Sequence, residues 1–523
     1  IKPRIGGGFG NKQEVLIEDL CAHLTLETGR PVRMEYTREQ EFTSSRRRHD
    51  NIIRYKIGVT GDQVTAASLY LIGDTGAYGT HGLTVNMVGG FKGLTLYNTP
   101  NSRFICDVVY TNTVPAGAFR GYGSMQCQYG IEVIMSEIAE KLGLDVIEFK
   151  KKNWIKVGEE MYLSQQLGEG RTGVKQSLET SAMEQCVEIG SRLTSFREKV
   201  QQYRGQTGRY RRGIGMAVVM HGSSVANLDM AAATLKLNDD GSFNLLIGAT
   251  DLGTGSDTIL AQVAAEVLHT DVNDMIVYSS DTDFTPFDKG AYASSTSYLS
   301  GEAVRKTAEA IKTQMLEHAG VMLGVKDITS LKLEYKKVVA QDGRSVTFEE
   351  IGLNSLHQQR QHQIMATESH VSPVSPPPTA AQFVEITLDT ETGKIEIDRL
   401  LMVVDCGRVI NPMTASGQVE GGMAQAMGFA LTEEMPYTAD GQPLYINLAK
   451  YHVPRAVEMP VMDVIFVQTD EPSGPYGVKS VAEISIDGVA PAMASAIHNA
   501  TGVWMREVPY TKERVKKALA DKA

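Results

Sequence analysis

Apolar residues recur at helical spacing in several separate stretches of the chain. In the clearest stretch, Ile131, Ile134, Met135, Ile138 and Leu142 follow the i, i+3, i+4, i+7 pattern of one helix face. The glycine that comes next is typical of a helix C-terminus. The same kind of pattern predicts further helices over residues 16–28, 259–268, 302–323, 491–500 and 511–519.

Other stretches alternate apolar and polar residues, which is typical of strands with one buried face. Such stretches meet at turn residues in three places, Gly61-Asp62, Asp240-Gly241 and Gly393, and each predicts a β-hairpin. A further β-like run spans Val32–Tyr36, and the proline-rich segment Ser372–Pro378 predicts a connector that is not helical. Because strands and helices are interspersed and several strand pairs are hairpins, we predict an α+β fold rather than a doubly wound sheet.

A polar region divides the chain. Residues 155–212 are more polar than their surroundings and contain the run GEGRTG and a basic stretch at Arg209–Arg212. The chain of 523 residues also exceeds the usual size of one domain. We therefore predict two elongated mixed α+β domains with antiparallel hairpins, over residues 1–205 and 206–523.

Composition and charge exclude several classes of protein. Lysine and arginine number 51 against 62 acidic residues, a net charge of −11, so an extensive nucleic-acid surface is not expected. No apolar stretch approaches the roughly 18 residues that a membrane helix needs. Five scattered cysteines without a CxxC motif predict reduced thiols in a cytoplasmic protein. The chain opens at Ile1 directly on a glycine-rich run, so we expect that it lacks the N-terminal part of a domain.

The glycine-rich run Gly6–Gln13 is the first of six segments suited to chemistry. Clustered glycines let backbone N–H groups approach an anion or a flat cofactor. The run is not a dinucleotide fingerprint, since Asn11 stands where the third glycine is needed. It is not a P-loop either, since Asn11 precedes Lys12 where that motif requires glycine. A functional loop and a plain glycine turn both remain open.

Three further loops offer hydrogen-bond donors. Arg120, between glycine and aromatic residues in Pro115–Gly123, is suited to binding a ligand or to bridging carbonyl groups of the chain. The segment Gly248–Ser256 is suited to a phosphate or pterin edge, or to capping the helix after it. The hydroxyl run Tyr292–Ser297 is suited to a polar cofactor, or to capping the helix near Glu302.

Two segments near the C-terminus complete the set. Asn411-Pro412 and the glycines that follow predict a closely packed helix on which Gln418 is an amide donor. Glu483 stands among small and apolar residues in Gly477–Ile484. Burial there would raise the pKa of Glu483 and suit general-base catalysis, and a surface or ion-paired glutamate is the alternative.

Taken together, the six segments resemble the molybdenum-binding part of the xanthine dehydrogenase and aldehyde oxidoreductase family, the molybdenum hydroxylases. Each motif alone is weak, but all six occur in the family's order, from GGGFGNK to VKSVAE. The likeness is greatest to the bacterial, separately encoded molybdenum-binding subunits. It implies a molybdenum–pterin cofactor, as molybdopterin or its cytosine dinucleotide form, held between the two domains. The metal is then bound by the pterin and by no protein side chain.

The resemblance also assigns roles to residues one by one. Glu483 falls where the family has its general base, and Gln13 and Tyr122 match positions that contact substrate. The positions beside the molybdenum, as backbone or neighbouring contacts only, are Phe9, Arg120 and Ala293. The cofactor-binding positions are Phe9, Gly10, Arg120, Gly253, Thr254, Ala293, Ser294, Thr296 and Gln418.

The implied activity is hydroxylation of an N-heterocycle, namely a purine such as hypoxanthine or xanthine, with oxygen from water. Electrons would pass to iron–sulfur clusters and FAD on partner subunits or on sequence outside this chain, in a dimer of heterotrimers. Val88 stands where the family's purine-binding arginine is expected, which keeps other substrates open. Nicotinate-like heterocycles and aldehydes are the alternative substrates, and a catalytically silent structural subunit is the alternative of another class.

Overall fold

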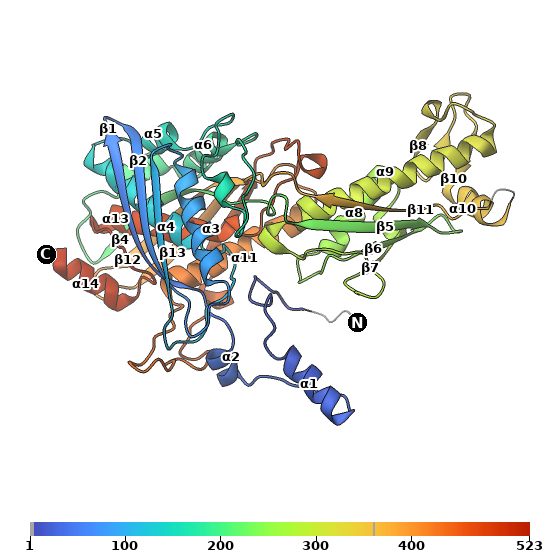
Figure 1. Cartoon of the computed structure of the whole chain (residues 1–523). Helices are drawn as coiled ribbons and strands as arrows, with labels where there is room; N and C mark the ends of the chain where they lie inside the picture. Colours follow the sequence, from blue (N-terminus) through green and yellow to red (C-terminus); the bar gives the residue numbers. More distant parts are fainter. Residues whose placement is uncertain (1–4, 359–360, 523) are drawn as a thin grey trace.

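The computed structural model describes residues 5–358 and 361–522, which form two lobes (Figure 1). The elements from β5 (Met230–Leu237) to β11 (Met365–Val371) extend from the larger lobe as a narrow second lobe. The larger lobe combines segments from both ends of the chain. Residues far apart in sequence therefore meet where the lobes join.

Two sheets form the frame of the larger lobe, with the strand orders β1-β2-β3 and β14-β13-β12-β4. Their bounds are β1 Asp50–Thr60, β2 Gln63–Asp74, β3 Ser102–Val109, β4 Tyr210–Met220, β12 Thr379–Asp389, β13 Ile395–Asp405 and β14 Val461–Phe466. The pairs β2/β3 and β13/β14 are parallel, and the other pairs in these two sheets are antiparallel. Nearly every residue of β12 is buried, because helices cover both faces of its sheet.

Most helices of the larger lobe pack on these sheets or on one another, whereas the first two along the chain have no buried residue. Their bounds are α1 Glu18–Thr28, α2 Arg38–Ser44, α3 Gly82–Leu96, α4 Ser124–Lys141, α5 Val146–Asn153, α6 Met183–Thr194, α7 Phe196–Gln202, α11 Pro412–Leu431, α12 Ile484–Asp487, α13 Val489–Thr501 and α14 Lys512–Lys522. α13 packs against β4 and β12, and α6 packs against β12 and β13. α4 contacts α3, α12 and α13, so it connects the start of the chain with its end.

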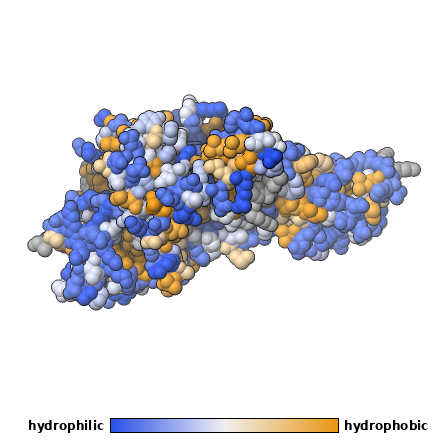
Figure 2. Space-filling model, turned by 90° about the horizontal axis from the view of Figure 1, so that it is seen from below, coloured by the Kyte–Doolittle hydropathy of each residue, from blue (hydrophilic) through white to orange (hydrophobic). Residues whose placement is uncertain are grey.

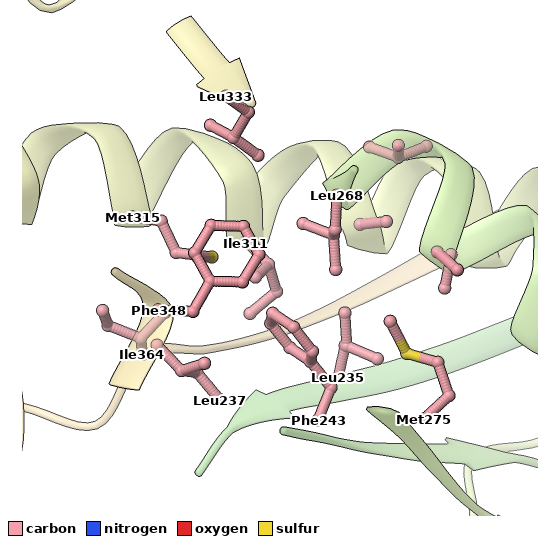
Figure 3. Close-up of a cluster of buried hydrophobic side chains, with 14 of the residues drawn as sticks. Leu235, Leu237, Phe243, Leu268, Met275, Ile311, Met315, Leu333, Phe348 and Ile364 are labelled. Atoms are coloured by element: carbon pink, nitrogen blue, oxygen red, sulfur yellow. The ribbon is translucent and has the colours of Figure 1, made fainter. Parts of the chain in front are cut away.

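The second lobe is a sheet of order β11-β5-β6-β7 covered by two helices. Its elements are β6 Phe243–Ile247, α8 Ser256–Leu268, β7 Met275–Ser279, α9 Thr296–Leu323 and, at the tip, β8 Lys332–Glu334, β9 Lys337–Val339, β10 Ser345–Thr347 and α10 Phe348–His357. Figure 3 shows the core between sheet and helices, where Phe243 and Phe348 meet edge to face with ring centroids 5.9 Å apart. Leu235 and Ile311 are fully buried in the same cluster. This core gives the second lobe a rigid base for its loops.

The predicted α+β fold is confirmed, and so are the predicted helices, which form α1, α4, α8, α9, α13 and α14. The three predicted hairpins form as β1/β2, β5/β6 and β12/β13. α9 begins at Thr296, earlier than the periodic pattern from Glu302 indicates. The predicted strand at Val32–Tyr36 is wrong, because in the described part of the chain this segment has no neighbouring strand to pair with.

Packing crosses the predicted domain boundary at residue 205. One cluster of buried residues joins Ile131 and Cys186 with Phe383 and Val403 from the second half of the chain. Buried side chains thus join the two halves, and the division of the chain into domains over residues 1–205 and 206–523 stays a prediction.

The surface seen from below is largely hydrophilic, with apolar patches between the hydrophilic residues (Figure 2). Within residues 5–358 and 361–522, no helix is both long and apolar enough to cross a membrane. All five cysteines are free. Burial raises the pKa of the Cys406 thiol to about 12, so this thiol is protonated and unreactive at neutral pH.

Candidate active site

A cavity of about 510 Å³ lies where the two lobes meet. Its walls come from loops and helix ends that are far apart in sequence, and they include parts of all six segments that the sequence analysis singled out. Every residue for which the sequence predicted a site role lines this cavity: Phe9, Gly10, Gln13, Arg120, Tyr122, Gly253, Thr254, Ala293, Ser294, Thr296, Gln418 and Glu483. The structure thus brings all of the predicted site residues together, while the role of each stays a prediction.

The glycine-rich loop forms one wall through backbone conformations that favour glycine. Gly7 and Gly10 have φ angles of 82° and 90°, and Phe9 has a φ angle of 53°. The Gly7 N–H donates to the Leu252 carbonyl over 2.8 Å, which joins this loop to the second lobe. A Cβ atom at Gly10 would lie 3.2 Å from the backbone carbon of Ala118. The loop therefore packs against the backbone of both lobes and is not an isolated turn on the surface.

We expect Gly10→Ala to lower the free energy of unfolding by more than Gly61→Ala does. Both glycines have positive φ angles, which cost a side chain about 1–2 kcal/mol, but a Cβ at Gly61 would meet no atom within 4 Å. The Gly10 variant should also bind less molybdenum, because its loop lines the cavity. Denaturant unfolding and metal analysis of the purified protein check both expectations. Equal losses of stability and full metal content in both variants would contradict the close approach of this loop.

Arg120 bridges two segments of the larger lobe with its guanidinium group. Its Nε donates to the Ala482 carbonyl over 2.7 Å, and its Nη2 donates to the Gln418 carbonyl over 2.7 Å and to Ser485 Oγ over 3.0 Å. Burial lowers the pKa of Arg120 to about 10, so the group is still cationic at neutral pH. Arg120 therefore bridges carbonyl groups of the chain, and the bridge fixes the residue before Glu483 against α11. Its contact with a ligand stays a prediction.

Tyr122 presents an oriented aromatic ring to the cavity. It lies between Arg120 and α4 with a φ angle of 41°, and its hydroxyl is 2.9 Å from both His81 Nδ1 and Thr84 Oγ1. Burial raises the pKa of Tyr122. The side chain is therefore a neutral ring in one orientation, which suits stacking on a flat ligand.

Glu483, in the sixth segment, lies on the cavity wall, with 15% of its side chain exposed. Ser294 Oγ donates to its Oε2 over 2.8 Å, and the Gly121 N–H donates to its Oε1 over 3.3 Å. Ser294 has a φ angle of 55°, and the neighbouring Ala293 one of 43°. The irregular turn before α9 therefore places the hydroxyl that holds the carboxylate.

The charge state of Glu483 follows from its neighbours. Burial raises its pKa, but the nearby His221 and Lys92 side chains and the hydrogen bond from Ser294 outweigh burial and lower the pKa below its ordinary range. The expectation that burial raises the pKa of Glu483 is therefore wrong in its net direction. The carboxylate is ionised at neutral pH, which is the form that can accept a proton.

The lining of the cavity fits a flat, polar organic cofactor. Gln13 Oε1, Ser224 Oγ and Ser256 Oγ are buried and have no hydrogen-bond partner among the described residues. Buried polar atoms normally have partners, so these three are available to a ligand rich in nitrogen and oxygen, such as a pterin. A Cβ on Gly253 would have no atom closer than 4.0 Å, so its backbone is open to the same space.

The sequence analysis missed Lys92, His221 and Asp487. Lys92 lines the cavity from α3, and no hydrogen bond or ion pair of its ammonium group is found within the described part of the chain. It follows Val88 by one helical turn, and that spacing could have pointed to it. His221 and Asp487 are single polar residues at the end of β4 and in α12, and no local pattern distinguishes them.

Comparison with known families agrees with this geometry. Residues 1–154 and 187–460 each match the molybdopterin cofactor-binding domain. The chain therefore belongs to the family of proteins with molybdopterin cofactor-binding domains, and the predicted resemblance is confirmed.

Two curated relatives place the chain within this family. It is 37% identical over 522 residues to the protein named Probable hypoxanthine oxidase XdhD of Escherichia coli (strain K12), covering 99% of this chain and 54% of that protein. It is 35% identical over 524 residues to the xanthine dehydrogenase molybdenum-binding subunit of Escherichia coli O157:H7, covering 98% of this chain and 68% of that protein. The chain thus spans about half the length of the first relative and two thirds of the second.

Solved structures show the same fold. Quinoline 2-oxidoreductase from Pseudomonas putida 86 matches with a TM-score of 0.90 at 24% identity, covering 99% of this chain and 68% of that one. Aldehyde oxidoreductase from Desulfovibrio gigas matches with a TM-score of 0.82 at 24% identity, covering 99% of this chain and 54% of that one. At this level of identity the likeness concerns the fold alone.

Proposed function

We propose that this chain is the cofactor-binding and catalytic part of a molybdenum-dependent hydroxylase that acts on an N-heterocycle, namely a purine such as hypoxanthine or xanthine. The observation that carries the proposal is the ionised Glu483 carboxylate on the wall of a cavity that is also lined by the other five predicted segments. The names of the two curated relatives, Probable hypoxanthine oxidase XdhD and xanthine dehydrogenase molybdenum-binding subunit, support it.

The lining residues divide between holding the cofactor and moving a proton. A molybdenum–pterin group, as molybdopterin or its cytosine dinucleotide form, supplies water-derived oxygen and accepts two electrons when bound. Glu483 takes up a proton at its carboxylate. Phe9, Arg120 and Ala293 lie beside the metal position. The groups that hold the pterin are Phe9, Gly10, Arg120, Gly253, Thr254, Ala293, Ser294, Thr296 and Gln418.

The substrate is proposed to stack on Tyr122, with the Gln13 amide and the Lys92 ammonium group as polar partners. An ammonium group without an ion-pair partner favours a ligand that carries a carbonyl oxygen or an anionic ring. This chemistry fits a purine and also fits a nicotinate-like heterocycle, which is the second candidate. A simple aldehyde carries only the carbonyl group that reacts, so it offers no second carbonyl oxygen or anionic ring to Lys92.

Lys92→Met tests this choice of substrate. A hydrogen bond to a charged group contributes about 1.5–3 kcal/mol, so we expect kcat/KM for xanthine to fall roughly 10- to 100-fold. Turnover of an aromatic aldehyde should change little. Lys156→Met is the matched control, since Lys156 lies over the Trp154 ring in the larger lobe, outside the cavity. A similar loss of kcat/KM for both substrates, or no loss for xanthine, would show that Lys92 does not bind the substrate.

The proposed function itself is tested on the purified complex. Hypoxanthine, xanthine, nicotinate and an aromatic aldehyde are each offered with an artificial electron acceptor, and bound molybdenum and pterin are measured. We expect oxidation of a purine by a molybdenum-containing protein. Products from aldehydes alone would overturn the purine preference, and absence of molybdenum and pterin would favour a catalytically silent structural subunit.

We infer further that electrons leave through iron–sulfur and FAD partner subunits, in a cytoplasmic dimer of heterotrimers. The name of one relative, the 6-hydroxypseudooxynicotine dehydrogenase complex subunit gamma of Paenarthrobacter nicotinovorans, supports assembly with partners, at 27% identity over 539 residues. Iron and flavin analysis of the native complex, together with its mass, tests the assembly.

A further inference from the structure

We propose that His221 and Asp487 are positioning residues for Glu483: Asp487 fixes the His221 imidazole, and the imidazole holds the Glu483 carboxylate at the cavity wall. This inference rests on the proposed function, because it concerns the residue expected to act as the base.

The three side chains form a row of carboxylate, imidazole and carboxylate. His221 directly follows β4 and is 3% exposed, and Asp487 at the end of α12 is completely buried. His221 Nδ1 lies 2.9 Å from Asp487 Oδ2, and His221 Nε2 lies 3.5 Å from Glu483 Oε2. Because Asp487 contacts Nδ1 of the ring, the opposite ring nitrogen faces Glu483.

Gln128 on α4 holds this row of side chains in place. Gln128 Nε2 donates to Asp487 Oδ2 over 3.3 Å and to the Met220 carbonyl over 2.7 Å, and Gln128 Oε1 accepts from the Met220 N–H over 3.0 Å. Gln128 therefore fixes both Asp487 and the residue before His221. These buried bonds leave the ring one orientation, with His221 Nε2 lacking any hydrogen-bond partner among the described residues.

The charges around the ring explain why it suits this role. The titratable groups that face His221 are Glu483 and Asp487 from around α12 and Lys92 from α3. Burial and Lys92 lower the pKa of His221, but the two carboxylates outweigh them and raise it overall. The ring thus carries more positive charge at neutral pH than an ordinary histidine does. A cation next to Glu483 favours its ionised form.

The first test is the pH dependence of kcat/KM for His221→Gln in the purified complex. Removing an opposite charge at this distance raises the pKa of a carboxylate by about 1–3 units, so the acid limb of the profile should move up by that amount. His318→Gln is the matched control, since His318 is 7% exposed and bonds Asn354 in the second lobe. A His221→Gln profile that superimposes on the wild-type profile overturns the proposal.

The second test needs no turnover, so it separates this inference from the proposed function. The chain is labelled with ¹³C-histidine, and the signal of His221 is assigned by its loss in His221→Gln. We expect its titration midpoint to lie above the ordinary value of about 6.5 and to fall in Asp487→Asn. A midpoint at the ordinary value that Asp487→Asn does not move overturns the proposed pairing of His221 with Asp487. An active enzyme with that result keeps the proposed function and loses only this inference.

Discussion

Replacing Glu483 by glutamine is expected to lower kcat/KM of the molybdenum-loaded complex by about 10²–10⁴-fold or more, the usual contribution of a general base. Ser294 and Gly121 hold the carboxylate at 2.8 and 3.3 Å. Glutamine has the same length, its amide oxygen can accept from the Gly121 N–H, and its amide NH2 can donate to Ser294 Oγ. It cannot take up the proton. Bound molybdenum should therefore stay unchanged while turnover is lost. Steady-state kinetics with metal analysis on the same sample measures both.

Glu385→Gln is the matched control for that variant. Glu385 is 4% exposed and pairs with Lys199 away from the cavity, so its replacement removes a comparably buried carboxylate from the same lobe. We expect it to reduce stability and to leave kcat/KM near the wild-type value. Near-normal turnover of Glu483→Gln at full molybdenum content would show that another group is the base.

Arg120→Met is expected to have the second largest effect, a loss of roughly 10²-fold in kcat/KM. The guanidinium group donates to the Ala482 carbonyl, so its removal frees the backbone next to Glu483, and a displacement of about 1 Å is enough for such a loss. The free energy of unfolding should fall by about 1–3 kcal/mol because buried carbonyl groups lose a donor. Kinetics, denaturant unfolding and molybdenum content measure the three effects.

Arg120→Lys separates charge from geometry at this position. Lysine keeps the positive charge but has no planar fork that reaches Ala482, Gln418 and Ser485 together. We expect it to behave nearly like Arg120→Met. Full activity of the lysine variant would mean that only the positive charge matters, and the bridge between α11 and Glu483 would then have no catalytic role.

Much of the fold follows from local patterns in the sequence. The helix α4 and the hairpin at Gly61-Asp62 form as predicted, because periodicity and turn residues act over a few neighbouring positions. The run Val32–Tyr36 has the same alternating pattern but is not a strand. A strand needs a partner, and whether a partner is near depends on the whole fold.

In the candidate site, too, some features follow from local sequence patterns and others depend on the whole fold. The glycine run and the Arg120 loop were found because backbone freedom and donor chemistry are properties of residue types at short spacing. The net pKa direction of Glu483 was predicted wrongly, because it depends on His221 and Lys92, which lie hundreds of residues away in sequence. Charge interactions depend on distance in space, which no local pattern gives.

By itself, the sequence determined the α+β class, most helices and hairpins, and six of the segments that line the cavity, since each depends on short-range chemistry. The roles of single residues followed from the family resemblance. Only the tertiary structure decided that these loops meet at the junction of the lobes, that Arg120 joins α11 to the segment of Glu483, and that Glu483 is ionised beside His221. These features arise from side chains brought within a few ångströms by packing of distant segments, and packing is a property of the folded chain as a whole.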